Sequence, residues 1–243
     1  MGLMDVLKTD KEIKEATDSI GGFSILESGI YPMKVKLAFI TLSAGKAMAL
    51  NIHFEGLKKE LLRAQFYMTS GEAKGCKNFY INKKTQEKHY LPGFNQANAL
   101  CLLTVGKEVA AMDTATKSIM LYDPMQQQEV PTDVDFIEDL VGKDVYAGVI
   151  NQLVDKRAKN KDTGQYEPTG ETRKENEVDK FFRAKDKLTV VEIKAKATEP
   201  IFFNKWKENW EGKTKDKTTK ASTTKGVPKR ETGKQAPQEN LFT

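Results

Sequence analysis

Residues 30–54, IYPMKVKLAFITLSAGKAMALNIHF, decide the fold class, because their apolar side chains recur at every second position. In 30–40 these side chains are Met33, Val35, Leu37 and Phe39. A turn at 43–46 follows, and the alternation returns with Met48, Leu50, Ile52 and Phe54, then a third time over 62–68. A period of two is typical of half-buried β-strands. The sequence therefore predicts three consecutive strands.

The opposite faces of these three strands share a basic, amide-rich and partly aromatic character. We expect them to expose Lys34, Lys36, Asn51, His53, Arg63, Gln65 and Tyr67. Three adjacent faces of this kind indicate a surface that could bind a partner. Lys34, Lys36, Arg63 and Tyr67 are the candidates for DNA contact.

The next segment, KNFYINKKTQEKHYLPGF at 77–94, carries a hairpin signal. Two short strand-like runs flank a polar turn at 83–86. The hairpin interleaves rings and ammonium groups: Lys77, Phe79, Tyr80, Lys83, Lys84, Lys88 and Tyr90. Single-stranded nucleic acid is bound by such a pattern, since bases stack on rings and phosphates lie against lysines. The alternative is an ordinary hairpin whose rings belong to the core.

The rest of the chain completes a mainly β protein. We expect a helix from Phe94 to near Gly106, mixed structure over 107–130, and a helix from Thr132 to Leu140. A long strand at 143–154, a charged flexible loop at 155–177, and strands at 178–183 and 187–196 follow. The predicted order is three strands, a helix, and then two more strands separated by a long loop. This is the order of an OB-fold, which is a partly open five-stranded barrel.

Bulk properties fit one soluble domain with extensions. The chain has 243 residues, a net charge of +5 and two cysteines, and it lacks an apolar run long enough for a membrane span. No secretory signal is evident, so we expect a cytoplasmic protein, in the host cell if viral. Residues 211–243 hold eight basic and four acidic side chains, a net of +4, which leaves +1 for the body. We expect a helical segment at 1–22, the OB-fold domain at 23–210 and a disordered basic tail at 211–243.

Three segments together resemble bacteriophage single-stranded-DNA-binding proteins. They are SGIYPMKVKLAF at 28–39, GCKNFYINKKTQEKHYLPGFNQANALC at 75–101, and LVGKDVYAGVINQLVDKR at 140–157 with VDKFFRAKDKLTVVEIK at 178–194. The resemblance covers about 28–200 and implies an OB-fold core that binds single-stranded DNA. It also implies a C-terminal tail that recruits replication proteins or host RNA polymerase. The tail here is basic, and only its tip, residues 239–243 with Leu241 and Phe242, keeps an acid beside bulky apolar groups.

Two further segments offer nucleic-acid contacts. The charged loop holds Arg157, Lys159, Tyr166 and Arg173, and a lone ring in a solvated loop is a good stacking candidate. Arg183 follows Phe181 and Phe182, of which at most one ring can face outward from a regular strand. Trp206 and Trp210 share a helical face, and we expect them to pack a terminal helix onto the body.

Catalysis finds little support in the sequence. The carboxylates Asp133, Asp135, Glu138 and Asp139 could hold a divalent metal, but an acidic helix start and solvated helix faces explain them. Cys76, His89, Cys101 and His53 contain zinc-ligand atoms, but their spacing lacks a paired C-x-x-C or H-x-x-x-H element. No phosphate-binding glycine motif is present. We therefore predict a non-enzymatic protein without cofactor or metal that binds single-stranded DNA regardless of sequence. The alternatives are a replisome adaptor and a metal-dependent nuclease.

Overall fold

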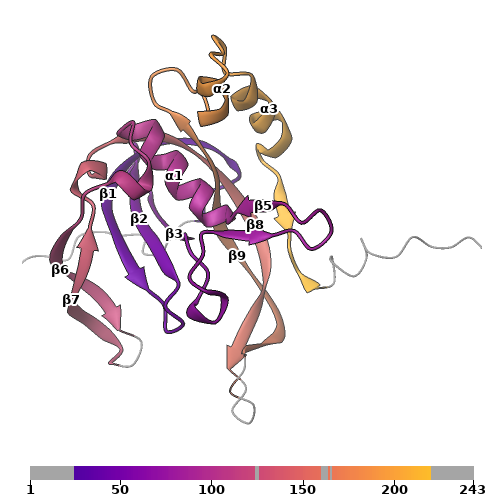
Figure 1. The fold of residues 1–243 in the computed structure, drawn as a ribbon. Helices are drawn as coiled ribbons and strands as arrows, with labels where there is room; N and C mark the ends of the chain where they lie inside the picture. Colours follow the sequence, from indigo (N-terminus) through magenta and orange to yellow (C-terminus); the bar gives the residue numbers. More distant parts are fainter. Residues whose placement is uncertain (1–24, 124–125, 160–163, 165, 220–243) are drawn as a thin grey trace, which may run out of the picture.

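The protein is mainly β, and its strands form an open antiparallel sheet (Figure 1). The computed structural model describes residues 25–123, 126–159, 164 and 166–219. Strands β1 (Gly29–Leu42), β2 (Met48–Gly56) and β3 (Leu61–Tyr67) form a meander, as predicted. The predicted helix at 1–22 lies outside the described residues.

The second half of the sheet starts at β1. Strand β8 (Asp144–Lys159) pairs with residues 29–34 of β1, and β9 (Tyr166–Arg183) pairs with the other edge of β8. The order across the sheet is therefore β9-β8-β1-β2-β3. No ladder joins β3 to β9 within the described residues, so the sheet does not close. The charged stretch predicted as a loop at 155–177 instead forms the distal arms of β8 and β9, because cross-strand hydrogen bonds satisfy its backbone.

A bulge in β1 changes which side chains face the core. The register with β2 shifts between Val35 and Leu37, so Val35 lies in the main core while Leu37 and Phe39 face outward. A single extra residue turns every following side chain to the opposite face. The prediction that all four alternate apolar residues of this strand share one face is therefore wrong after Lys36.

Leu37 and Phe39 are covered by a hairpin that the sequence did not predict. Strands β6 (Ala115–Asp123) and β7 (Gln128–Phe136) pair with each other. The end of β7 also pairs with β1 at Phe39 and Ile40, on the edge opposite β2. The predicted helix from Thr132 to Leu140 is wrong. Val134 and Phe136 are buried at period two, and only a short 3-10 turn, Glu138–Leu140, follows. A second short turn spans Val109–Ala111.

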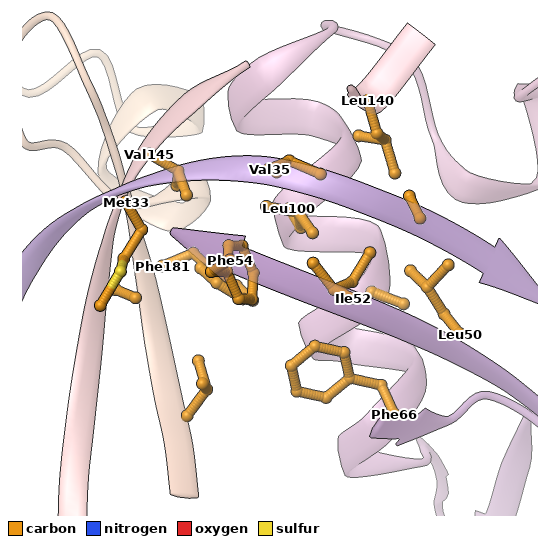
Figure 2. Packing of buried hydrophobic residues seen from close by; sticks show 14 of the residues in the cluster. Met33, Val35, Leu50, Ile52, Phe54, Phe66, Leu100, Leu140, Val145 and Phe181 are labelled. Atoms are coloured by element: carbon orange, nitrogen blue, oxygen red, sulfur yellow. The ribbon is translucent and has the colours of Figure 1, made fainter. Parts of the chain in front are cut away.

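The main core lies between the sheet and helix α1 (Pro92–Thr104), whose position was predicted. Figure 2 shows Val35, Ile52, Phe54 and Leu100 between this helix and strands β1 and β2. The helix also contacts both β3 and β9, the two open edges. Its second residue must be glycine, since a Cβ on Gly93 would lie 2.2 Å from the carbonyl oxygen of Tyr67.

A second apolar layer covers the outer face of β8 and β9. Helix α3 (Ile201–Trp210) places Trp206, which is 3% exposed, against Ile150 and Phe182. Gly148 makes room for the indole, because a Cβ there would lie 3.0 Å from it. The predicted packing of the two tryptophans is confirmed for Trp206, while Trp210 is half-buried beside it.

The predicted strand at 187–196 is wrong. Residues Val190–Lys194 form helix α2, which begins with a capping box made by Thr189 and Glu192. Each of these two side chains accepts a hydrogen bond from the other's backbone N–H. This local capping outweighs the β propensity of the paired valines.

The chain returns to the sheet at β10 (Thr214–Asp216), which runs parallel to β8 just beyond the start of β1. Ser28 links the residue before β10 to β8. Its hydroxyl donates a hydrogen bond to the Lys213 carbonyl at 2.5 Å and accepts one from the Asn151 N–H at 2.8 Å. The predicted tail therefore begins too early at 211, since 211–219 belong to the body. Residues 220–243, including Leu241 and Phe242, lie outside the described residues.

Candidate nucleic-acid interface

A hollow of about 750 Å³ separates the two open edges of the sheet. Strand β3 contributes Arg63, Gln65 and Tyr67 to its lining, and β9 contributes the stretch from Asn176 to Asp179. The alternation of β3 explains the first set, since Leu62 and Phe66 are buried while Arg63, Gln65 and Tyr67 are exposed. We call this hollow the seam.

Amide side chains order the outer face of the sheet beside the seam. Gln65 donates to Asn51 at 2.9 Å, and Asn51 donates to the Thr41 hydroxyl at 2.8 Å. His53 lies opposite Arg63 in the ladder and packs its ring edge-on to Phe39 at 5.8 Å. Burial, and then the charge of Arg63, lower the pKa of His53. His53 is therefore neutral at pH 7.

The predicted hairpin is present as β4 (Phe79–Ile81) and β5 (Lys88–Tyr90), after a 3-10 turn at Glu72–Lys74. Its rings are outside the core clusters: Tyr80 is 48% exposed and Tyr90 is 57% exposed. Phe79 is half-buried, with the ammonium groups of Lys77 and Lys88 5.8 and 5.3 Å from its ring centre. For Tyr80 and Tyr90 the structure therefore excludes the alternative of core rings.

The hairpin and β9 border a further hollow that lengthens the seam. A second hollow, of about 570 Å³, is lined by Tyr80, Lys88, Tyr90 and Lys180. It adjoins the seam, because Pro92, Gln96 and Asp179 line both. A third hollow, of about 450 Å³, reaches helix α2 and shares Tyr90, Gln96 and Lys180 with the second. We call the three together the groove.

The acidic side chains of the groove already have partners. Asp179 accepts a hydrogen bond from the Trp206 indole at 2.7 Å, and its backbone carbonyl accepts one from Gln96. Glu177 lies 3.6 and 2.8 Å from the ammonium groups of Lys215 and Lys217. The cations that line the groove are Arg63, Lys74, Lys88, Lys180 and Lys194. The groove thus favours an anionic ligand.

Three cations that were predicted to contact DNA form ion pairs with carboxylates of the protein. Lys34 and Lys36 form ion pairs with Asp144 and Glu55 at 3.2 and 3.0 Å, and neither lines the groove. Arg183 forms a two-pronged pair with Asp186 at 2.9 and 2.5 Å. Hydrogen bonding to Arg183 lowers the pKa of Asp186. These pairs fix local structure and leave less positive charge for a ligand.

The arms of β8 and β9 carry four of the predicted contacts. Tyr166, which is 66% exposed, pairs across the ladder with Lys159, and Arg157 pairs with Pro168. Arg173 contacts Glu175 at 3.0 Å. Figure 1 shows these arms projecting from the body beyond the β4–β5 hairpin. They form a two-stranded ribbon that carries both basic and acidic side chains, where the sequence predicted a loop.

The candidate metal ligands are dispersed in the structure. Glu138 pairs with Lys117, and Asp139 lies 3.5 Å from Lys107. Cys101 is buried, and burial raises its pKa to about 12, whereas Cys76 is exposed. In the described residues, no three His, Cys, Asp or Glu side chains are placed to hold a metal ion.

Comparisons with known proteins add no assignment. No protein-family model matches the chain, and no curated protein matches it. No helix of the described part is both long and apolar enough to cross a membrane.

Sequence reasoning missed several residues of the groove, namely Lys74, His89, Asn95, Gln96, Asn176, Lys180 and Lys194. Gln96 lies on the predicted helix, but nothing in the sequence indicated that the polar face of this helix lines a groove. Lys180 lies in the predicted strand at 178–183, but only the tertiary structure places Lys180 and Tyr80 in the lining of one hollow. No local pattern could have identified this contact.

Proposed function

We propose that this protein binds single-stranded DNA without sequence preference. The observation that carries the proposal is the continuous groove, which joins half-exposed tyrosines of the β4–β5 hairpin to cations along the open side of the sheet. Tyrosine rings can stack on any base, and lysine and arginine side chains can contact the phosphates.

Strand connectivity supports an OB-type architecture for this site. Strand β1 pairs with both β2 and β8, and β9 pairs with β8. Helix α1 lies in the segment between β3 and β8, after the β4–β5 hairpin and before the β6–β7 hairpin. An OB-fold is a partly open five-stranded barrel that binds oligonucleotides across the face of its second and third strands. Here β3 borders the seam, and Arg63, Gln65 and Tyr67 line it.

Binding would be stoichiometric. Each phosphate contact releases condensed counterions, so affinity should fall as salt rises. The resemblance of the sequence to bacteriophage single-stranded-DNA-binding proteins suggests a role in protecting exposed strands during phage replication, recombination or transcription. Replication proteins or host RNA polymerase are the corresponding candidate partners.

The test is a fluorescence-anisotropy titration of labelled oligo-dT and of a duplex of equal length, with and without magnesium. We expect at least ~10-fold tighter binding of the single strand, because stacking contributes about 1–3 kcal/mol per base. Equal affinity for both would contradict the proposal. Absence of binding would favour an adaptor, and magnesium-dependent shortening of the oligonucleotide would favour a nuclease.

A further inference from the structure

The β6–β7 hairpin ends in an unprotected strand edge. In the described part of the chain β6 pairs only with β7, so its other edge presents backbone N–H and C=O groups to solvent. Figure 1 shows this hairpin standing away from the body, at the opposite side from the β4–β5 hairpin. A free edge of nine residues is a template for another strand.

The two strands of this hairpin differ in how they deter such pairing. Strand β7, QEVPTDVDF, contains Pro131 and three outward acids, features that block edge-to-edge contact. Strand β6, ATKSIMLYD, contains no proline, and its only charges are Lys117 and Asp123. Its middle is apolar and exposed, with Met120 56% and Tyr122 60% accessible. Protection is therefore present on β7 and missing on β6.

The sequence of β6 is complementary to itself in one antiparallel register. With Met120 on a two-fold axis, Lys117 faces Asp123 of the second copy, Ser118 faces Tyr122 and Ile119 faces Leu121. Opposite charges thus meet at both ends, and apolar side chains meet on each face between them. We propose that β6 is a homodimer interface, in which two copies pair edge to edge into a four-stranded sheet.

The surroundings of β6 fit this partner. Ile119 and Leu121 are half-buried against Phe39 and Phe136, so a second copy would extend an existing apolar layer. Lys117 already contacts Glu138 and lies 4.7 Å from the Phe136 ring, which holds its ammonium group near the strand. The flanking charge pairs would set register more than strength, because exposed ion pairs contribute little.

The expected dimer is weak. One strand edge with two short faces buries less than the ~1,200 Å² of a standard stable interface. Association should therefore depend on protein concentration in the micromolar range. It is independent of the proposed DNA binding, because the groove lies on other elements, and it should occur without nucleic acid.

Sedimentation of the full chain across about 1–100 μM tests the interface. We expect the weight-average mass to rise from the 27.3 kDa of one chain toward twice that value. Met120→Lys, which brings two ammonium groups together on the axis, should hold the mass at one chain. The matched control Leu57→Lys, at an 84% exposed leucine in the β2–β3 turn, should dimerise like the wild type.

Disulfide trapping tests the register. In a Cys76→Ser background, which removes the exposed thiol, Met120→Cys should cross-link two chains under mild oxidation, because residues facing each other across a ladder bring their Cβ atoms close. Ser118→Cys should cross-link at least tenfold more slowly, since its neighbour is Tyr122. A monomeric wild type, a Met120→Lys variant that still dimerises, or equal cross-linking at both positions would overturn the proposal. Melting temperatures of all variants confirm that each is folded.

Discussion

Tyr80 and Tyr90 differ in what surrounds their rings. Tyr90 lies 4.8 Å from Phe94, the first aromatic residue of α1, so its ring also supports the helix start. Tyr80 lies 5.7 Å from His89 within the hairpin and touches no core cluster. Tyr80 is therefore the cleaner probe of stacking, because its removal should leave the fold intact.

Tyr80→Ala should weaken oligo-dT binding by about 1–3 kcal/mol, or roughly 5- to 150-fold. The free energy of unfolding should change by less than about 1 kcal/mol, as is usual for an exposed side chain. Tyr122→Ala, at another exposed tyrosine outside the groove, is the matched control and should leave affinity unchanged. The oligonucleotide should be short enough to bind only one protein molecule, so that contacts between two protein copies do not affect the measured affinities. Equal losses in the two variants would exclude Tyr80 as a specific contact.

The lowered pKa of His53 makes it a reporter of charge at Arg63. Burial and Arg63 lower this pKa, so Arg63→Gln should raise it, while burial should still hold it below its ordinary value. A phosphate bound at Arg63 should raise it in the same direction. NMR titration of the two histidine rings measures both effects, with a His53→Gln variant for assignment. A His53 pKa that stays unchanged on oligo-dT binding would place the phosphates away from Arg63.

At the level of single residues, the sequence predicted outward positions well where strands are regular. Arg63, Gln65 and Tyr67 face outward as the alternation indicated, since β3 has no bulge. Phe39 was misplaced because the bulge after Val35 has no glycine or proline to announce it. The position of Lys180 beside the hairpin depends on chain segments about a hundred residues apart, which no local pattern records.

Elements were predictable where one period dominates. The three-strand meander, α1 and the β4–β5 hairpin follow their sequence patterns. Residues 132–140 were misread because capping and dipole preferences were given more weight than the alternation of Val134 and Phe136. Residues 190–194 are β-branched in part, but the capping box of Thr189 and Glu192 determines their helix.

The close approach of α1 to β3 depends on Gly93. Gly93→Ala should destabilise the protein by about 1–3 kcal/mol, because the new Cβ meets backbone atoms of Tyr67 that cannot rotate away. Oligo-dT affinity should also fall, since Tyr67 and Gly93 both line the seam. Gly45→Ala is the control: its nearest non-neighbouring atom would be 4.0 Å from the added Cβ. Chemical unfolding measures both variants, and equal stability would show that α1 can shift freely.

The arms of β8 and β9 should bind phosphates through their cations. Arg157→Gln with Lys159→Gln should reduce the slope of log affinity against log salt by about 0.7 for each phosphate that the variant no longer neutralises. Lys34→Gln with Lys36→Gln removes the same charge from two ion-paired lysines outside the groove and should leave the slope nearly unchanged. If both double variants flatten the slope equally, the effect comes from net charge and the arms do not touch the DNA.

At the scale of the molecule, β10 sets where the body ends. Truncation after Thr219 should preserve the melting temperature and most single-strand affinity, since β10 remains paired with β8. Truncation after Gly212 should lower stability, because Lys215 and Lys217 then no longer neutralise Glu177 and the Ser28 hydroxyl has no Lys213 carbonyl to donate to. Thermal unfolding and anisotropy on both truncations check this.

A large affinity loss in the Thr219 truncation would assign phosphate contacts to the lysines of 220–243. Unchanged binding leaves Leu241 and Phe242 as candidates for partner recruitment, as the resemblance implied. Composition alone suggested the tail and its charge, but the parallel pairing of β10 could not be foreseen from three residues, TKD.

The junction at Ser28 has a consequence for chain connectivity. The Ser28 carbonyl accepts a hydrogen bond from the Gly212 N–H at 2.9 Å, and the Ser28 hydroxyl accepts one from Asn151 of β8. Thr219 donates a hydrogen bond to Asp155, which lies four residues further along β8 than Asn151. About 13 Å of strand thus separates the places where the body starts and finishes. A short glycine–serine linker could join them, with new termini opened at the exposed β2–β3 turn near Leu57. The open sheet should therefore tolerate circular permutation, with the native starting point as one choice among several.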